Sequence, residues 1–370
     1  MNCARCGKET LTGAQFCQSC ASELKQVFLA PKNPDIRTSW LAILSLVLGI
    51  LSLFTCGITA IPAIVLGIIS LIRIEKGGGK LTGIAFAKIG LAIPVIVFCI
   101  VQPLLLAFVT VRHKYFRMVC QANLGGIGTS MLIYVNDWDD KFPRAGGPST
   151  VWGTTANWQA DNKASAFGIQ PDGSGGQASI SASLYTMYKS YFGSGPASFV
   201  CKGDRGVTPF DPDEYGAGNK THFDLWDFGP DPSKHCSYSY HIPYGPYPLT
   251  TSSEPGMAVA ADRNPWIPSP FVKTKKDFGK FDPNGTTKQV KYGNATAHNG
   301  EGQNVLFVDG HVYFQKRPFC AINDDNIHTF WSGSAPNWDK RKGIPPQIGS
   351  QPKDRLDSLL VNDPPVTDKK

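Results

Sequence analysis

Hydrophobic residues are unevenly distributed along this chain of 370 residues. Residues 39–111 consist of nearly unbroken apolar runs, whereas the sequence after Trp138 is rich in Gly, Pro, Asn, Asp and aromatic residues. The first pattern is typical of a lipid-embedded region and the second of a water-exposed fold. We therefore expect a multi-domain membrane protein.

Residues 39–72 carry no charge and are too long for one straight crossing, because such a helix would span about 50 Å against a hydrocarbon core of about 30 Å. A break is expected near Gly57, followed by Pro62. The pattern predicts a hairpin of two short helices, residues 39–54 and 58–72, rich in small residues that allow close packing. A basic loop, residues 73–80, and a third apolar helix follow.

Charge distribution sets the expected topology. Lys25, Lys32, Arg37 and the basic loop belong in the cytoplasm under the positive-inside rule, so three crossings place everything after Val111 on the outer side of the membrane. Residues 39–111 are then a transmembrane helical domain that contacts the lipid bilayer. The alternative is two crossings, with residues 39–72 as one tilted helix, which would return the last domain to the cytoplasm. No cleavable signal peptide is expected at the start.

Four N-terminal cysteines form two CxxC pairs, Cys3 with Cys6 and Cys17 with Cys20. Two such pairs can bring four thiolates to one tetrahedral ion, and Zn²⁺ is its natural occupant. A disulfide or a redox CxxC is the rival interpretation. We expect residues 1–24 to be a zinc ribbon whose metal is structural, because four thiolates leave no open coordination position. Residues 25–38 have no periodicity and are expected to be a linker.

The sequence does not favour an enzyme or a nucleic-acid-binding protein. The net charge of +7 is spread along the sequence, and its basic runs are short. No nucleophile elbow, phosphate-binding loop or HExxH helix is present. We expect a protein that is not an enzyme.

The last apolar helix is expected to continue beyond the membrane as a half-buried helix. Met118, Leu124, Ile127, Met131 and Tyr134 recur at helical spacing. The pattern predicts a helix over residues 104–135.

Near the C-terminus, residues 304–308 and 311–314 alternate as two strands around Asp309 and Gly310. The pattern predicts a β-hairpin with Asp309-Gly310 as a two-residue turn at positive φ.

Several phrases after residue 104 resemble, in order, the prepilin-type, processing-associated proteins with a His-x9-Asp-Gly signature. This family is abundant in planctomycete-like bacteria and similar to type II secretion pseudopilins. The matching phrases are residues 118–124 (MVCQANL), 131–143 (MLIYVNDWDDKFP), 199–204 (FVCKGD), 236–240 (CSYSY), 260–265 (AADRNP) and 298–312 (HNGEGQNVLFVDGHV). The signature residues are His298, Asp309 and Gly310, one residue further apart than in the family.

The resemblance implies an α+β pilin-like ectodomain over residues 104–338, with a long N-terminal helix on an antiparallel sheet. Residues 339–370 are expected to be a disordered tail. The family's Gly-Phe…Glu cleavage site is missing from residues 93–106, so we expect the chain to remain uncleaved. Residues 39–100 resemble a small bacterial membrane domain of unknown function that often follows zinc ribbons.

The implied function is a structural, adhesive or secretion-associated role at the cell surface, in an assembly that the sequence does not identify. The alternative is a membrane sensor, in which an outer binding domain is coupled to a zinc ribbon that contacts a cytoplasmic protein.

Candidate chemistry in the ectodomain is limited. Turn formation explains Asp309, and a metal site built from His298, Asp309, His311 and Asp262 is the alternative, which would make the domain a metal-dependent hydrolase.

Four cysteines (Cys120, Cys201, Cys236 and Cys320) fall in the segment expected outside, where disulfides form. Three pairings are open, and we expect Cys201 with Cys236 because the loop between them is moderate. Abundant Tyr and Trp residues suit core packing, or else a protein or glycan partner.

Overall fold

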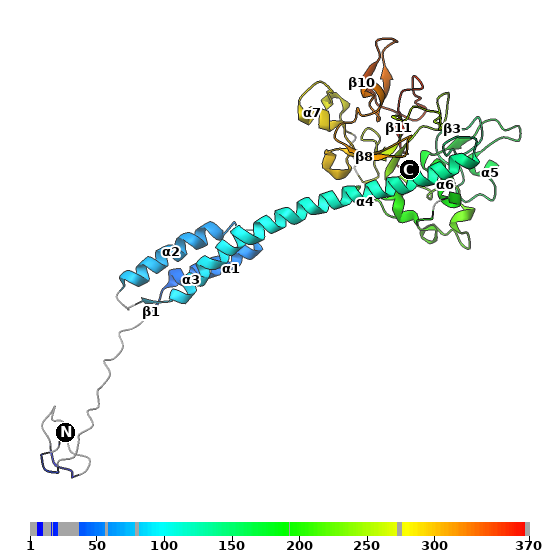
Figure 1. Ribbon diagram of the computed structural model, residues 1–370. Helices are drawn as coiled ribbons and strands as arrows, with labels where there is room; N and C mark the ends of the chain where they lie inside the picture. Colours follow the sequence, from blue (N-terminus) through cyan, green and yellow to red (C-terminus); the bar gives the residue numbers. More distant parts are fainter. Residues whose placement is uncertain are drawn as a thin grey trace. The chain divides into compact units, whose positions relative to one another are not determined.

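The structure is a computed structural model that describes residues 6–9, 16, 18–20, 37–55, 58–77, 81–191, 193–271 and 276–366. It divides into two compact units, Met1–Val109 and Thr110–Lys370, labelled by element in Figure 1. Cys3, Cys17 and most of the predicted linker lie outside the described residues. The zinc ribbon therefore stays a prediction.

The first unit is a small helical bundle. Helices α1 (Trp40–Phe54) and α2 (Ala60–Lys76) form the predicted hairpin, and α3 (Ile84–Ile96) packs against both. Strands β1 (Arg37–Thr38) and β2 (Leu81–Thr82) pair in parallel. The predicted break between residues 54 and 58 is confirmed by the bounds of α1 and α2.

The bundle is packed with small residues inside and large apolar residues outside. A Cβ atom at Gly90 would lie 2.7 Å from the backbone nitrogen of Leu46, so glycine is required there. The Ser45 hydroxyl donates to the Ala63 carbonyl at 2.9 Å. The exposed side chains include Trp40, Ile43, Val47, Leu51, Phe54, Ile61, Val65 and Ile68. This inverted arrangement suits helices surrounded by lipid, where close approach and hydrogen bonds replace the hydrophobic effect as the cause of packing.

Helix α3 continues through a π-helical turn (Val97–Val101) into α4 (Gln102–Asp137). Together they form one helix, Ile84–Asp137, of 54 residues. Within the described ranges it is the one helix that is long and apolar enough to cross a membrane, and α1 is apolar but shorter. This helix, together with the sheet of the second unit, supports a membrane-anchored α+β protein.

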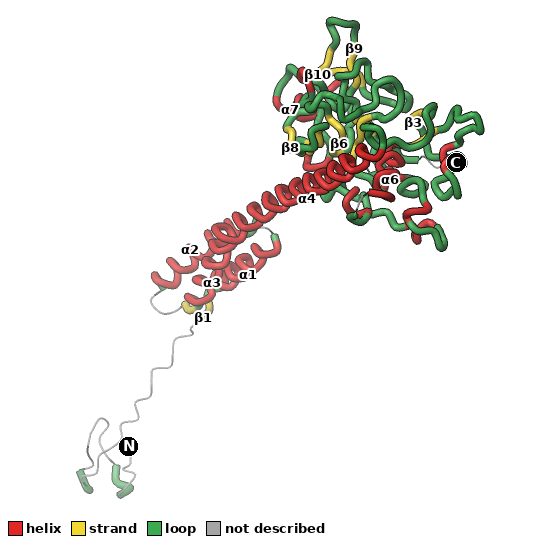
Figure 2. The backbone as a smooth tube through the Cα atoms, turned by 45° about the vertical axis from the view of Figure 1, so that its right-hand side comes forward, coloured by secondary structure: helices red, strands yellow, loops and turns green. Residues whose placement is uncertain are grey.

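The second unit is built on a five-stranded antiparallel sheet in the order β11-β5-β6-β7-β8. These strands are β5 (Tyr238–His241), β6 (Ala258–Asp262), β7 (Gln303–Phe307), β8 (Val312–Gln315) and β11 (Leu360–Val361). Every residue of β5, β6 and β7 is buried, so both faces of the central sheet are covered. Loops and short turns account for most of the remaining chain, as Figure 2 shows.

Helix α4 packs on one face of this sheet. Its residues Cys120, Leu124, Ile127 and Met131 are fully buried, which confirms the predicted half-buried helix. A Cβ atom at Gly128 would lie 2.7 Å from a methyl group of Leu306 on β7, so the missing side chain lets helix and sheet approach closely.

The other elements of the second unit are shorter. They are helices α5 (Lys163–Phe167), α6 (Ile180–Tyr191) and α7 (Thr287–Tyr292), and the strand pairs β3 (Val151–Trp152) with β4 (Gln177–Ala178) and β9 (Phe330–Ser332) with β10 (Asp339–Ile344). Single 3₁₀ turns occupy Pro196–Phe199, Pro212–Tyr215, His222–Asp224, Pro232–Lys234, Phe278–Lys280, Ala297–Gly300 and Ile322–Asp324.

The prediction of a disordered tail over residues 339–370 is wrong for the described part, residues 339–366. Strand β11 pairs with β5, and Leu360 and Val361 are fully buried. Asp363 accepts hydrogen bonds from the amides of Ile180 and Ser181, at 2.8 and 2.9 Å, at the start of α6. The high content of Pro, Asp and Lys suggested disorder, but the few apolar residues of this segment complete the central sheet.

Removing residues 345–370 should unfold the second unit, because burial of each large apolar side chain of β11 contributes about 1.5–3 kcal/mol and Asp363 would be lost as well. A chain that ends after Asp363 is the control and should melt like the full chain. Thermal unfolding of the detergent-purified proteins, followed by near-UV circular dichroism, separates the two. Equal melting of both truncated chains would contradict the structural role of β11.

Candidate functional site: a buried disulfide with histidine and aspartate

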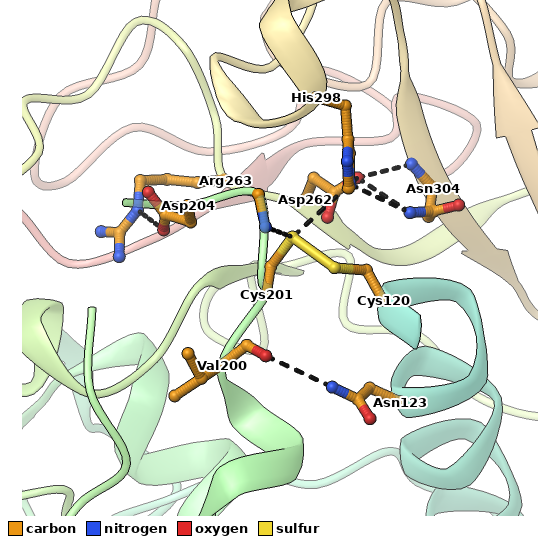
Figure 3. Close-up of a disulfide and its surroundings, with 10 residues drawn as sticks. Cys120, Asn123, Val200, Cys201, Asp204, Asp262, Arg263, His298 and Asn304 are labelled. Atoms are coloured by element: carbon orange, nitrogen blue, oxygen red, sulfur yellow. Dashed lines mark hydrogen bonds and ion pairs between the residues drawn. A yellow bond between two sulfur atoms is a disulfide. The ribbon is translucent and has the colours of Figure 1, made fainter. Parts of the chain in front are cut away.

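Four buried residues from distant parts of the chain converge beside the central sheet (Figure 3). Cys120 comes from α4, Cys201 follows the turn Pro196–Phe199, Asp262 ends β6, and His298 lies in the turn before β7. We call these four residues the disulfide centre. Each of them also belongs to one of the phrases that resemble the prepilin-type family.

The disulfide joins Cys120 to Cys201, with Cα atoms 5.2 Å apart and a sequence separation of 81. The predicted pairing of Cys201 with Cys236 is therefore wrong. Cys236 is buried, its thiol lies 3.7 Å from the Tyr238 carbonyl, and burial raises its pKa to about 12. The prediction relied on loop length and could not include the packing of α4, which brings Cys120 to Cys201.

His298 and Asp262 lie against the disulfide. The Nε2 atom of His298 is 3.4 Å from the sulfur of Cys201 and 3.3 Å from Oδ2 of Asp262. The neighbouring Asn304 on β7 donates its backbone amide to Oδ2 of Asp262 at 2.7 Å, and its side-chain amide lies 3.2 Å from the same oxygen. Asn304 Nδ2 is also 3.3 Å from His298 Nε2. Asn304 therefore orients both the carboxylate and the imidazole.

The backbone at His298 is held in an unfavourable conformation. His298 and Asn299 have φ values of 57° and 60°, in the left-handed region that side-chain-bearing residues rarely adopt. Gly203 packs against the ring, where a Cβ atom would lie 2.9 Å from Nδ1 of His298. On the other side, Arg117 of α4 forms an ion pair with Glu301, which holds the turn against the helix. These contacts place the imidazole next to the disulfide.

A second buried ion pair lies beside the centre. Arg263 donates to Asp204 at 3.0 Å and to the carbonyl oxygens of Ser233 and Cys236 at 2.8 and 2.7 Å. Tyr238 faces Asp262 across the sheet, and burial, with the Asp262 carboxylate, raises the pKa of its phenol well above its ordinary value. The surroundings of the centre are therefore buried and tightly packed.

The structure separates the signature residues. Asp309 and His311 contact each other through a carboxylate oxygen and Nδ1 at the tip of the β7–β8 hairpin, away from the His298–Asp262 group. The predicted hairpin is confirmed. Positive φ occurs at Gly310, at 84°, but not at Asp309, so the expected turn geometry is wrong at that residue. The metal alternative that combined His298 with Asp309 and His311 is wrong in its ligand set.

Most of the aromatic residues belong to the core. Tyr185, Tyr238, Tyr240, Trp266 and Trp331 are each at most 2% exposed, which confirms core packing as their main role.

In the comparison with known proteins, one family model matches part of the chain. A family model described as Domain of unknown function (DUF4190) matches residues 41–103, nearly the same stretch that resembles a small bacterial membrane domain. No curated protein and no solved structure matches the chain. The family match and the long apolar helix together indicate a membrane-associated protein.

The metal alternative from the sequence combined Asp262 with His298, but sequence reasoning did not combine either of them with Cys120 or Cys201. A signal was available, because four of the six family-like phrases contribute one residue each. In chemical terms the centre can cross-link α4 to the rest of the domain, or supply thiolate, imidazole and carboxylate ligands. Its four members are at most 4% exposed, so a substrate has no direct access to them.

Replacing Gly203 with Ala should destabilise the second unit by about 1–3 kcal/mol, because the new methyl group overlaps the His298 ring and backbone. Gly195→Ala is the matched control, since Gly195 has ordinary φ and ψ of −70° and 174° and open space around it. Urea unfolding followed by tryptophan fluorescence measures both. Equal midpoints for the two variants would show that the contact with His298 is not a constraint.

Proposed function

We propose that this chain is a membrane-anchored, pilin-like protein that displays its second unit outside the bacterial inner membrane in a structural or adhesive role, without catalysis. The zinc ribbon would lie in the cytoplasm. The observation that carries the proposal is helix α4. Its beginning exposes Leu104, Leu106 and Phe108, whereas its later turns are buried against an antiparallel sheet and joined to it through Cys120.

The disulfide supports a location outside the cytoplasm. Disulfides form and persist in oxidising compartments, and the Cys120–Cys201 bond lies in the core of the second unit. The three-crossing topology predicted from charge leads to the same side of the membrane. The disulfide and the charge distribution are independent arguments for the same location of the second unit.

The surface of the second unit suits binding more than catalysis. A cavity of about 370 Å³ lies at the C-terminal end of α4, lined by Tyr134, Trp138, Arg144, Pro248 and Leu249 among others. The rings of Tyr134 and Trp138 stack at 5.4 Å, and Trp138 is half exposed. An exposed aromatic face beside Arg144 can stack on a sugar ring or pack against a protein. We place the protein or glycan partner of the ectodomain here.

A topology experiment tests the proposal. In cells that express the full chain, the Cys120–Cys201 bond should form, and a protease added to spheroplasts should digest the second unit while an N-terminal tag stays protected. Cys120→Ser is the control for the disulfide band on a non-reducing gel. The intact mass should equal that of the full chain.

Two outcomes would contradict the proposal. A second unit that resists external protease and contains reduced Cys120 and Cys201 would support the two-crossing topology. A mature form that begins near Ile93 or Leu104 would indicate an ordinary processed pseudopilin.

A further inference from the structure

The disulfide centre has the composition of a metal site. One potential ligand atom from each of Cys120, Cys201, Asp262 and His298 lies within 4.8 Å of all the others, and all four residues are buried. It is the group that satisfies these conditions within the part of the chain that the structure describes. Two sulfurs, one imidazole nitrogen and one carboxylate oxygen are a complete set for tetrahedral Zn²⁺.

Distances within the centre already approach those of a tetrahedral site. Bonds of about 2.0–2.3 Å to zinc imply ligand-to-ligand distances of about 3.3–3.8 Å. His298 Nε2 lies 3.3 Å from Asp262 Oδ2 and 3.4 Å from Cys201 Sγ. The other ligand-to-ligand distances are at most 4.8 Å, and reduction of the disulfide lets the two sulfur atoms separate.

The surrounding groups also match a metal site. The Oδ1 atom of Asp262 is buried without a hydrogen-bond partner among the described residues. Burying a carboxylate oxygen in this way costs free energy unless a positively charged group contacts it. Asn304 holds the other oxygen, Oδ2, and contacts His298 Nε2. A carboxylate that is held by neighbouring hydrogen bonds in this way is typical of metal centres. The Asn304 amide would give up its contact with His298 Nε2 when that nitrogen binds the ion.

We propose that the reduced chain binds one thiophilic divalent ion such as Zn²⁺ through Cys120, Cys201, Asp262 and His298, and that this form and the disulfide exclude each other. A phosphine or thiol reductant supplies two electrons, and two protons complete the two thiols. The metal then displaces both thiol protons as it binds. The proposal concerns the reduced state and does not depend on which side of the membrane the domain occupies.

Co²⁺ is the probe, because thiolate ligands give its complexes a charge-transfer absorption that counts them. The protein is the full chain in detergent with Cys3, Cys6, Cys17 and Cys20 replaced by Ser, which removes the predicted zinc ribbon. After reduction with a phosphine, it should bind one Co²⁺ per chain with a two-thiolate tetrahedral spectrum. The oxidised sample should bind none. Added Zn²⁺ should displace the Co²⁺.

His298→Gln and Asp262→Asn should each weaken Co²⁺ binding at least tenfold, because each variant removes one ligand. Cys320→Ser is the matched control, since Cys320 is partly buried but outside the centre, and its spectrum should be unchanged. Each variant is also examined in its oxidised form by near-UV circular dichroism. A retained fold there shows that weaker binding reflects the lost ligand.

A second measurement uses the wild-type chain. Under reducing conditions, Zn²⁺ should slow alkylation of Cys120 and Cys201, mapped by mass spectrometry, but leave Cys320 unaffected. The proposal is overturned if the reduced protein binds no Co²⁺, whether folded or not. Equal Co²⁺ binding by the oxidised and reduced samples of the chain that lacks the four N-terminal cysteines, or by that chain and both of its ligand variants, overturns it as well.

Discussion

Helix α4 is exposed near its beginning and buried along one stripe in its later turns, and the fold of the second unit depends on that buried stripe. Leu104, Leu106 and Phe108 are exposed, whereas from Cys120 onwards one stripe of the helix is buried against the sheet. Gly128 allows the close approach to Leu306, and the disulfide fixes the helix to the Cys201 turn. Because a closed loop of this length restricts the unfolded chain, the cross-link contributes about 4–5 kcal/mol in the entropic model.

Burial of charge next to this cross-link is the second constraint. Asp262 is fully buried and is met by Asn304 and His298, and the adjacent Arg263 is matched by Asp204. Unpaired charges at such positions would cost several kcal/mol. The left-handed backbone of His298 is tolerated because Gly203 and Arg117 hold the turn from two sides. The same features that make the centre stable also pre-arrange ligands for a metal.

Local patterns in the sequence predicted individual helices and hairpins better than they predicted which distant segments pack together. The α1–α2 hairpin, the half-buried stripe of α4 and the β7–β8 hairpin followed from periodicity and turn residues. The pairing of Cys120 with Cys201 did not, because it depends on packing between segments distant in sequence. Residues 360–361 were missed because a run of only three apolar residues, 359–361, in a polar context carries no periodic signal. His298 was identified by resemblance and grouped with Asp262, but its contact with Cys201 was not predicted.

The position of β11 has a consequence for the order of synthesis and folding. This strand comes from the last residues of the chain, yet it pairs with β5, and Asp363 holds the start of α6. The sheet and the helix therefore stay incomplete until residues 360–363 have been synthesised, and contacts of such long range form slowly. Until then, the apolar faces of β5 and α6 are uncovered. A chain interrupted before residues 360–363 would therefore expose apolar surface that the folded second unit covers.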